Sequence, residues 1–141
     1  MMWAVLGGSL IIACCFHGYS IWQISLLTGQ LKGRIRTHGD LLMVKEVINT
    51  NMRMAIAYIV FWLLLVAILI WTVVARLLLF PQAITVFFLF GVITLPLGLI
   101  GKGFEKKIHA LQVESSDPAL EGTLRSWLVQ WKEPRLQLPD D

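Results

Sequence analysis

Three long apolar runs alternate with polar stretches along the chain, and none of the three contains Asp, Glu, Lys or Arg. They extend from Met2 to about Gln23, from Met54 to Ala75 and from Ala83 to Gly101. A helix of about 20 apolar residues is long enough to cross the roughly 30 Å hydrocarbon core of a bilayer. The pattern therefore predicts an all-α membrane protein with three transmembrane helices.

Aromatic residues and prolines add detail to these helices. Trp3 and Trp22 stand at the two ends of the first run, about 28 Å apart at 1.5 Å per helical residue, and tryptophan is enriched at both membrane–water interfaces. No basic residue precedes this run, so we expect an uncleaved helix rather than a signal peptide. Pro96 predicts a kink in the last third of the third helix. Residues 76–82, with Pro81 as the turn signal, predict that the second and third helices form a tight hairpin whose tip lies in the interface.

The polar connection between the first and second runs, residues 25–53, begins with a segment rich in glycine and basic residues at 29–39. Such a segment is typical of a loop held near anionic headgroups. Nucleic-acid binding is not expected, because no aromatic residues are interleaved with the charges. Asp40 is the expected N-cap of a short amphipathic helix, which either follows the membrane surface or continues into the second run. Its apolar face carries Leu41, Leu42, Val44, Val47 and Ile48.

The polar tail, residues 102–141, predicts a further amphipathic helix. Residues 104–113 can extend the third helix, after which Asp117 is the expected N-cap and Pro118 the first helical residue. Pro134 ends this helix. We expect its apolar face to dock on a partner, because tryptophans dominate interface energies; the alternative is that it packs on the short amphipathic helix of the same chain. The face consists of Leu120, Leu124, Trp127, Leu128 and Trp131.

Composition and the placement of charge support a membrane protein. Hydrophobic residues make up 57% of the chain and charged residues 15%, with a mean hydropathy of +0.72, whereas soluble domains carry about 25% charged residues. Basic residues gather in the polar connection and the tail, so the positive-inside rule places the N-terminus outside and the C-terminus inside. The expected organisation is a transmembrane helix (1–24), a basic inner connection (25–53), a transmembrane hairpin (54–101) and an inner tail (102–141).

Candidate chemistry is sparse. The sequence contains no phosphate-binding loop, zinc motif or catalytic constellation, so we do not expect an enzyme. His17 is the one titratable residue inside an apolar run apart from Cys14 and Cys15, and an intramembrane histidine is a functional candidate by default. It either ligates haem or chlorophyll or hydrogen-bonds a neighbouring helix or headgroup. A bis-histidine haem is not expected, because His38 and His109 lie in polar segments. The two adjacent cysteines are expected to be packing residues.

These features favour a non-catalytic accessory, scaffold or assembly subunit of a larger integral membrane complex, in contact with other membrane-protein subunits. The lack of a carboxylate within the apolar runs argues against an ion-coupled transporter. Small residues four apart, Ala4 with Gly8 and Ser9 with Ala13, permit close contact between helices. The alternative is a small subunit of an electron-transfer or photosynthetic complex, with His17 as a ligand to haem or chlorophyll; otherwise no cofactor or metal is expected.

Overall fold

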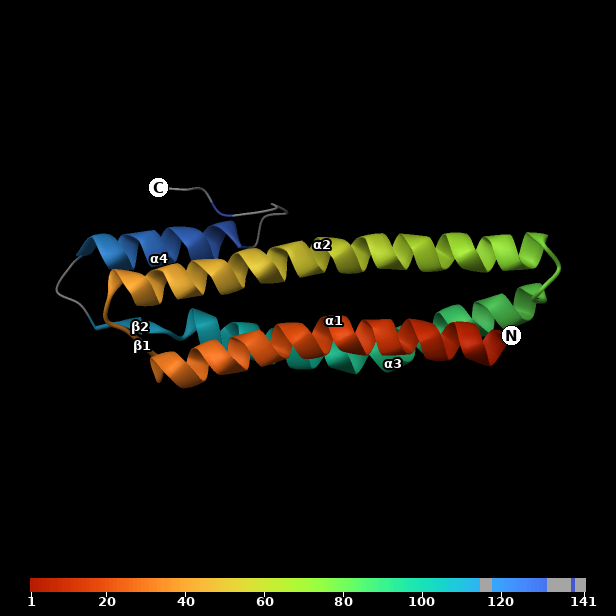
Figure 1. The fold of residues 1–141 in the computed structure, drawn as a ribbon, viewed down its shortest axis with the longest axis horizontal. Coiled ribbons are helices and arrows are strands. Elements are labelled where there is room, and N and C mark those ends of the chain that lie inside the picture. The colour runs from red at the N-terminus through yellow and green to blue at the C-terminus, as the bar shows by residue number, and fades with distance from the viewer. Residues whose placement is uncertain (115–117, 132–137, 139–141) are drawn as a thin grey trace.

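The computed structural model describes residues 1–114, 118–131 and 138, and this part of the chain is helical apart from one short pair of strands (Figure 1). Three helices, α1 to α3, are long and apolar enough to cross a membrane, as predicted. The elements in chain order are α1 (Met2–Leu31), β1 (Arg34–Ile35), α2 (His38–Val74), α3 (Phe80–His109), β2 (Gln112–Val113) and α4 (Pro118–Gln130).

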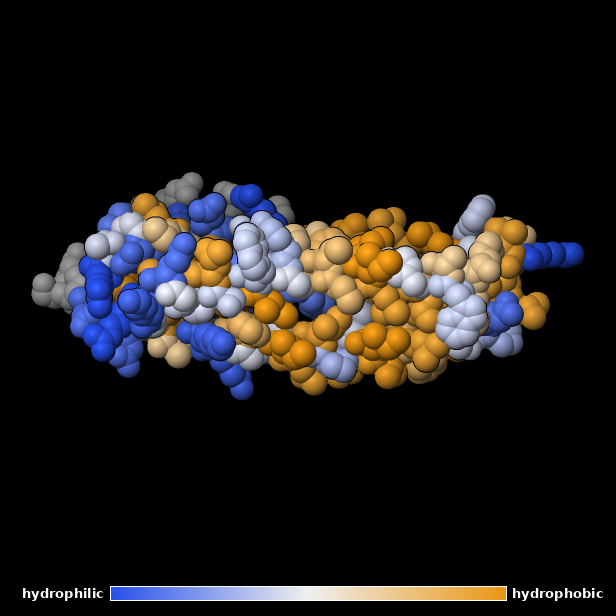
Figure 2. Space-filling model, turned by 60° about the horizontal axis from the view of Figure 1, so that its bottom comes forward, coloured by the Kyte–Doolittle hydropathy of each residue, from blue (hydrophilic) through white to orange (hydrophobic). Residues whose placement is uncertain are grey.

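The long helices lie roughly parallel to one axis, and the two ends of this bundle differ (Figure 1). One end holds the start of α1 and the turn between α2 and α3, and the other holds β1, β2 and α4. We call residues 24–53, 102–114, 118–131 and 138 the head, and residues 2–23, 54–74 and 80–101 the membrane section. Hydrophobic side chains cover most of the membrane section, whereas hydrophilic ones gather over the head (Figure 2).

Helix α1 continues well beyond the predicted end near Gln23 and reaches Leu31. No proline interrupts this extension, and its buried residues Ile24, Leu27 and Leu31 recur at helical spacing. The helix ends where Lys32 (φ 48°) and Gly33 (φ 79°) adopt left-handed backbone angles, a common way to end a helix. The predicted glycine-rich loop is therefore confined to residues 32–37, since α2 begins at His38.

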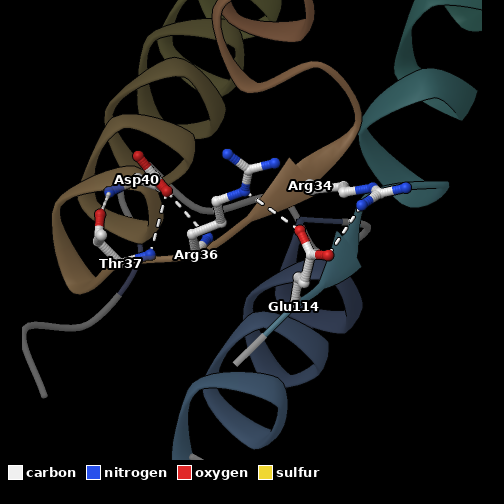
Figure 3. Close-up of polar contacts among 5 residues, drawn as sticks. All are labelled: Arg34, Arg36, Thr37, Asp40 and Glu114. Atoms are coloured by element: carbon white, nitrogen blue, oxygen red, sulfur yellow. Dashed lines mark hydrogen bonds and ion pairs between the residues drawn. The ribbon is translucent and has the colours of Figure 1, made fainter. Parts of the chain in front are cut away.

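Helix α2 joins the short amphipathic helix directly to the second apolar run, which is one of the two expected alternatives. The N-cap, however, is Thr37 and not Asp40. Thr37 has extended backbone angles, and its Oγ1 accepts a hydrogen bond of 3.1 Å from the Asp40 N–H. The Asp40 carboxylate in turn accepts bonds from the N–H groups of Thr37 (3.0 Å) and Arg36 (2.9 Å), which completes a capping box (Figure 3). These bonds lower the pKa of Asp40, and the bond from the Arg36 N–H has the largest effect.

Residues 75–79 connect α2 to α3. The turn is shorter than the predicted 76–82, because Pro81 lies in the first turn of α3 and not in the loop; proline is accepted there since the N–H it lacks would have no helical partner. Arg76 supplies the left-handed turn residue (φ 57°).

Helix α3 packs mainly along α1 and less along α2. It continues through Pro96 to His109, so the predicted extension over 104–113 is only partly correct.

The last two residues of that predicted extension form β2, a strand that the sequence does not predict. β2 pairs in parallel with β1, with Arg34 opposite Gln112 and Ile35 opposite Val113. Two-residue strands are too short to show an alternating pattern, so periodicity alone does not reveal them. The pair ties the loop after α1 to the end of α3.

The buried residues form two clusters, one in each section. The head cluster draws on every element of the head except β2, whose Val113 packs against it, and consists of Ile24, Leu27, Leu31, Ile35, Leu41, Val44, Ile48, Met52, Ile108, Leu111, Leu124, Trp127 and Leu138. The membrane cluster joins α1, α2 and α3 and consists of Leu6, Ala13, Leu65, Leu69, Ala83, Val86 and Phe90.

Candidate functional site

The expected docking face of α4 is packed against the chain itself. Leu124 and Trp127 are each 3% exposed and belong to the head cluster with residues of α2. Leu120, Leu128 and Trp131 are half-buried against the same cluster. Helix α4 lies beside the first turns of α2 (Figure 1). This agrees with the alternative prediction, in which the apolar face packs on the short amphipathic helix of the same chain. The predicted cap of this helix, Asp117, and its predicted stop, Pro134, lie outside the described residues.

Two aromatic contacts hold the α4 region in place. The Lys45 ammonium lies 5.2 Å from the centroid of the Trp127 ring, and the Trp131 ring stacks on His109 at 5.6 Å. The Trp127 Nε1 is buried and has no hydrogen-bond partner among the described residues. Trp127 therefore contributes through packing and its contact with Lys45.

His17 lies in the membrane section, half-buried, with its ring edge-on to Tyr58 at a centroid distance of 4.9 Å. It stands at the end of a series of aromatic contacts that links α1, α2 and α3. The spacing of Tyr58, Phe61 and Trp62 on one helical face was the sequence signal for this series. Its other members are Phe16, Phe87, Phe88 and Phe90.

His17 and Tyr58 also mark the junction of two open hollows beside α3. The first, of about 470 Å³, lies in the membrane section and has an almost entirely apolar lining. Its residues are His17, Tyr58, Trp62, Phe87, Phe88, Gly91, Val92, Thr94, Leu95 and Gly98. The second, of about 600 Å³, shares His17, Tyr58 and Gly98 with the first. We call the two together the α2–α3 groove, because these helices supply most of its lining.

The second hollow leads from the membrane section into the head, and its lining is more polar. Ser20 of α1 donates a hydrogen bond to Oδ1 of Asn51 in α2, and both residues line the hollow. From α3 come Lys102, Glu105 and His109. The groove therefore changes from aromatic and aliphatic at one end to hydroxyl, amide and charged groups at the other.

The positions of the histidines bear on the haem hypothesis. His17 and His109 both line the second hollow. Two axial ligands of one haem must both reach its iron. The two rings have different neighbours, since His17 lies against Tyr58 and His109 stacks on Trp131. Within the described residues, no three His, Cys, Asp or Glu side chains group in a way that could hold a metal ion.

The two small-residue pairs of α1 have different surroundings. Ser9 and Ala13 are buried, at 5% and 0% exposure, where α1 meets the rest of the bundle. Ala4 and Gly8 lie on the opposite face and are exposed. Both Cys14 and Cys15 are exposed as well, so they do not pack within this chain, because α1 turns these positions away from α2 and α3.

Comparison of the chain with protein families, with curated proteins and with solved structures found no match.

Proposed function

We propose that this chain is a non-catalytic accessory, scaffold or assembly subunit of a larger integral membrane complex. The observation that carries the proposal is a stripe of small residues on the outer face of α1. Helical steps of four, three, four and three connect its members, and all are exposed. The stripe consists of the small residues Ala4, Gly8, Cys15 and Gly18 and, between them, the larger Ile11.

Small residues have a particular meaning on a lipid-facing surface. Lipid tails are as apolar as leucine side chains, so helices in a bilayer associate through close packing, which small residues allow. A Cβ atom added at Gly8 or Gly18 would meet nothing within 4 Å. The fold of the chain therefore does not require these glycines, whereas a helix of another subunit would use the space they leave.

The proposal includes an orientation for the complex. The positive-inside rule places the head, with Lys102, Lys106 and Lys107, on the inner side near anionic headgroups, and the start of α1 outside. Helices α2 and α3 then form the transmembrane hairpin, with Arg76 near outer headgroups. A reporter that is active only outside the membrane, fused after residue 141, is expected to be inactive; activity there would contradict this orientation.

Co-purification tests the stripe. The double variant Ala4→Leu, Gly8→Leu places bulky side chains on the stripe and is expected to lower the recovery of companion subunits in mild detergent. Ala67→Leu is the matched control, because Ala67 is an exposed alanine on α2. Both variants should insert and keep the helical content of the wild type. Recovery of companions at the wild-type ratio with the double variant would contradict the proposal.

A further inference from the structure

We propose that the α2–α3 groove binds one glycerophospholipid of the inner leaflet, with its phosphate at Lys102 and one acyl chain in the apolar hollow. This site lies on a different face from the stripe on α1 and does not depend on the proposed subunit role; its assignment to the inner leaflet rests on the proposed orientation. The groove brings together three properties of a lipid site: an apolar channel, an opening toward the bilayer and a charged end at the membrane boundary.

The apolar part of the groove is open sideways. Phe88, Val92 and Leu95 line it and are 65%, 66% and 62% exposed. In a bilayer these side chains face hydrocarbon, so an acyl chain can enter laterally without crossing a polar barrier. Tyr58 and Trp62 form the opposite wall on α2. A chain that enters from the bilayer therefore has aromatic rings on both sides of it.

Three glycines leave open space between the side chains on the α3 side of the groove. Gly91, Gly98 and Gly101 follow one another at steps of seven and three along one face of α3. A Cβ atom at any of them would meet nothing within 4 Å. Contact with the neighbouring helices therefore does not account for these glycines, and the space above them belongs to the groove.

The length of the groove fits one leaflet. Gly91 and Lys102 are 11 residues apart, about 16 Å along the helix at 1.5 Å per residue. This is about half of the roughly 30 Å hydrocarbon core of a bilayer. A lipid whose phosphate contacts Lys102 would therefore extend its acyl chain along Gly98 to about Gly91.

The charges at the boundary fit a phospholipid headgroup. Lys102 and Glu105 are exposed, both line the second hollow, and neither forms an ion pair with another described residue. The Lys102 ammonium is suited to a phosphate, and Glu105, one turn away, to the ammonium of ethanolamine. The Asn51 amide lies in the same lining. A headgroup with both charges, such as phosphatidylethanolamine, therefore meets complementary groups.

Native mass spectrometry of the full chain tests the proposal. The protein is reconstituted in vesicles of phosphatidylethanolamine and phosphatidylglycerol, extracted in mild detergent and examined for retained lipid. We expect one retained phospholipid, with phosphatidylethanolamine enriched over its share of the vesicle. Gly98→Phe fills the groove and is expected to abolish retention. Lys102→Gln removes the phosphate contact and is expected to lower retention about tenfold, as the loss of one charge-assisted hydrogen bond implies.

Two matched variants separate the groove from general lipid contact. Gly103→Phe changes an exposed glycine of α3 that does not line the groove, and Lys106→Gln removes a neighbouring charge that does not line it either. Both should retain lipid at the wild-type level. The proposal would be overturned if Gly98→Phe and Lys102→Gln retained as much lipid as the wild type. A retained quinone or haem, detected by its absorption spectrum, would also overturn it, as would the absence of retained lipid in the wild type. Because Lys102 is exposed, its variant stays informative if Gly98→Phe fails to fold.

Discussion

The head and the membrane section are built from the same three long helices, yet they are packed differently. In the head, Ile35, Val44, Ile48, Ile108 and Leu138 are fully buried, at 0% exposure, and they come from four separate parts of the chain: β1, α2, α3 and the residue 138 that follows α4. In the membrane section, large side chains such as Leu63, Trp71 and Val74 are more than 60% exposed. In each of the three long helices, at most 22% of the most apolar 18-residue stretch is buried inside the protein.

The solvent explains this difference. The head meets water, so its apolar side chains must be covered by the chain, at about 25 cal/mol per Å² of apolar surface removed from water. The membrane section meets hydrocarbon, where an exposed leucine costs nothing and helices are held by close packing instead. Helix α4 and the β1–β2 pair are therefore needed only at the head.

The largest expected effect follows from Trp127. Trp127→Ala removes an almost fully buried ring from the head cluster and should lower the free energy of unfolding by about 3–5 kcal/mol. Together with Trp131→Ala it should leave the chain misfolded or degraded even when expressed alone. Thermal unfolding in detergent and steady-state abundance measure this.

Two tryptophan controls sharpen the result. Trp127→Phe keeps a buried aromatic ring and removes the five-membered ring of the indole, whose N–H has no partner among the described residues, so it should cost less than Trp127→Ala. Trp71→Ala, at a position 62% exposed in the membrane section, should change stability by no more than about 0.5 kcal/mol. A Trp127→Ala variant that is as stable as the wild type but has lost its companion subunits would instead favour a docking role for the α4 face.

A pair of leucines on α2 tests the comparison most directly. Leu41 is 1% exposed in the head and Leu65 is 3% exposed in the membrane section. Leu41→Ala should cost about 2–5 kcal/mol, because it loses both transfer from water and packing. Leu65→Ala should cost about half as much, since its unpacked state is solvated by lipid and only the packing term is lost. Equal costs, measured by reversible unfolding in bicelles, would show that the two sections are stabilised in the same way.

The sequence predicts the membrane section better than the head for the same physical reason. A long apolar run can be read from composition alone, and α1, α2 and α3 each contain one. The head depends on contacts between distant segments, such as Ile35 beside Val113, which no local pattern reveals. The true N-cap, Thr37, was missed because Thr37 and Asp40 both suit that position and only the geometry shows which residue has extended backbone angles.

The candidate site shows the same limit. The position of His17 inside an apolar run and the small residues of α1 are visible in the sequence. Which face of α1 turns outward is not, because it depends on where α2 and α3 pack. The α2–α3 groove likewise needs Ser20, Asn51 and Lys102 from three helices, and their proximity is a property of the fold.

A smaller effect is expected at the N-cap of α2, where the head meets water. Thr37→Ala removes the side-chain oxygen that accepts from Asp40 and should cost about 1 kcal/mol.

The lowered pKa of Asp40 gives this cap a pH dependence. Its contribution is fully present above the ordinary value of 3.8 and is lost as the pH falls from there through the lowered folded value. Asp40→Asn should therefore differ from the wild type in melting temperature at neutral pH and converge with it in acid. A constant difference down to the most acidic pH tested would contradict a role for the charge.

The smallest effect concerns the ion pairs across the β1–β2 pair. Glu114 accepts from Arg34 at 2.8 Å and from Arg36 at 3.1 Å (Figure 3), but the side chains are 49–65% exposed. Pairs as exposed as these contribute about 0–1 kcal/mol and are screened by salt. Glu114→Gln should therefore destabilise the chain slightly, and less so at high salt. The backbone bond from the Glu114 N–H to the Ile35 carbonyl, 2.8 Å, remains in the variant.

Glu46→Gln is the matched control, because Glu46 is an exposed carboxylate of the head that forms no ion pair with another described residue. It should not alter the melting temperature at either salt concentration. If the head is held by its apolar cluster, Glu114→Gln will stay close to this control. A loss of more than about 2 kcal/mol, beyond the range of exposed pairs, would mean that polar contacts at the strand pair hold the head, and the contrast with the membrane section would then rest on charge instead of burial.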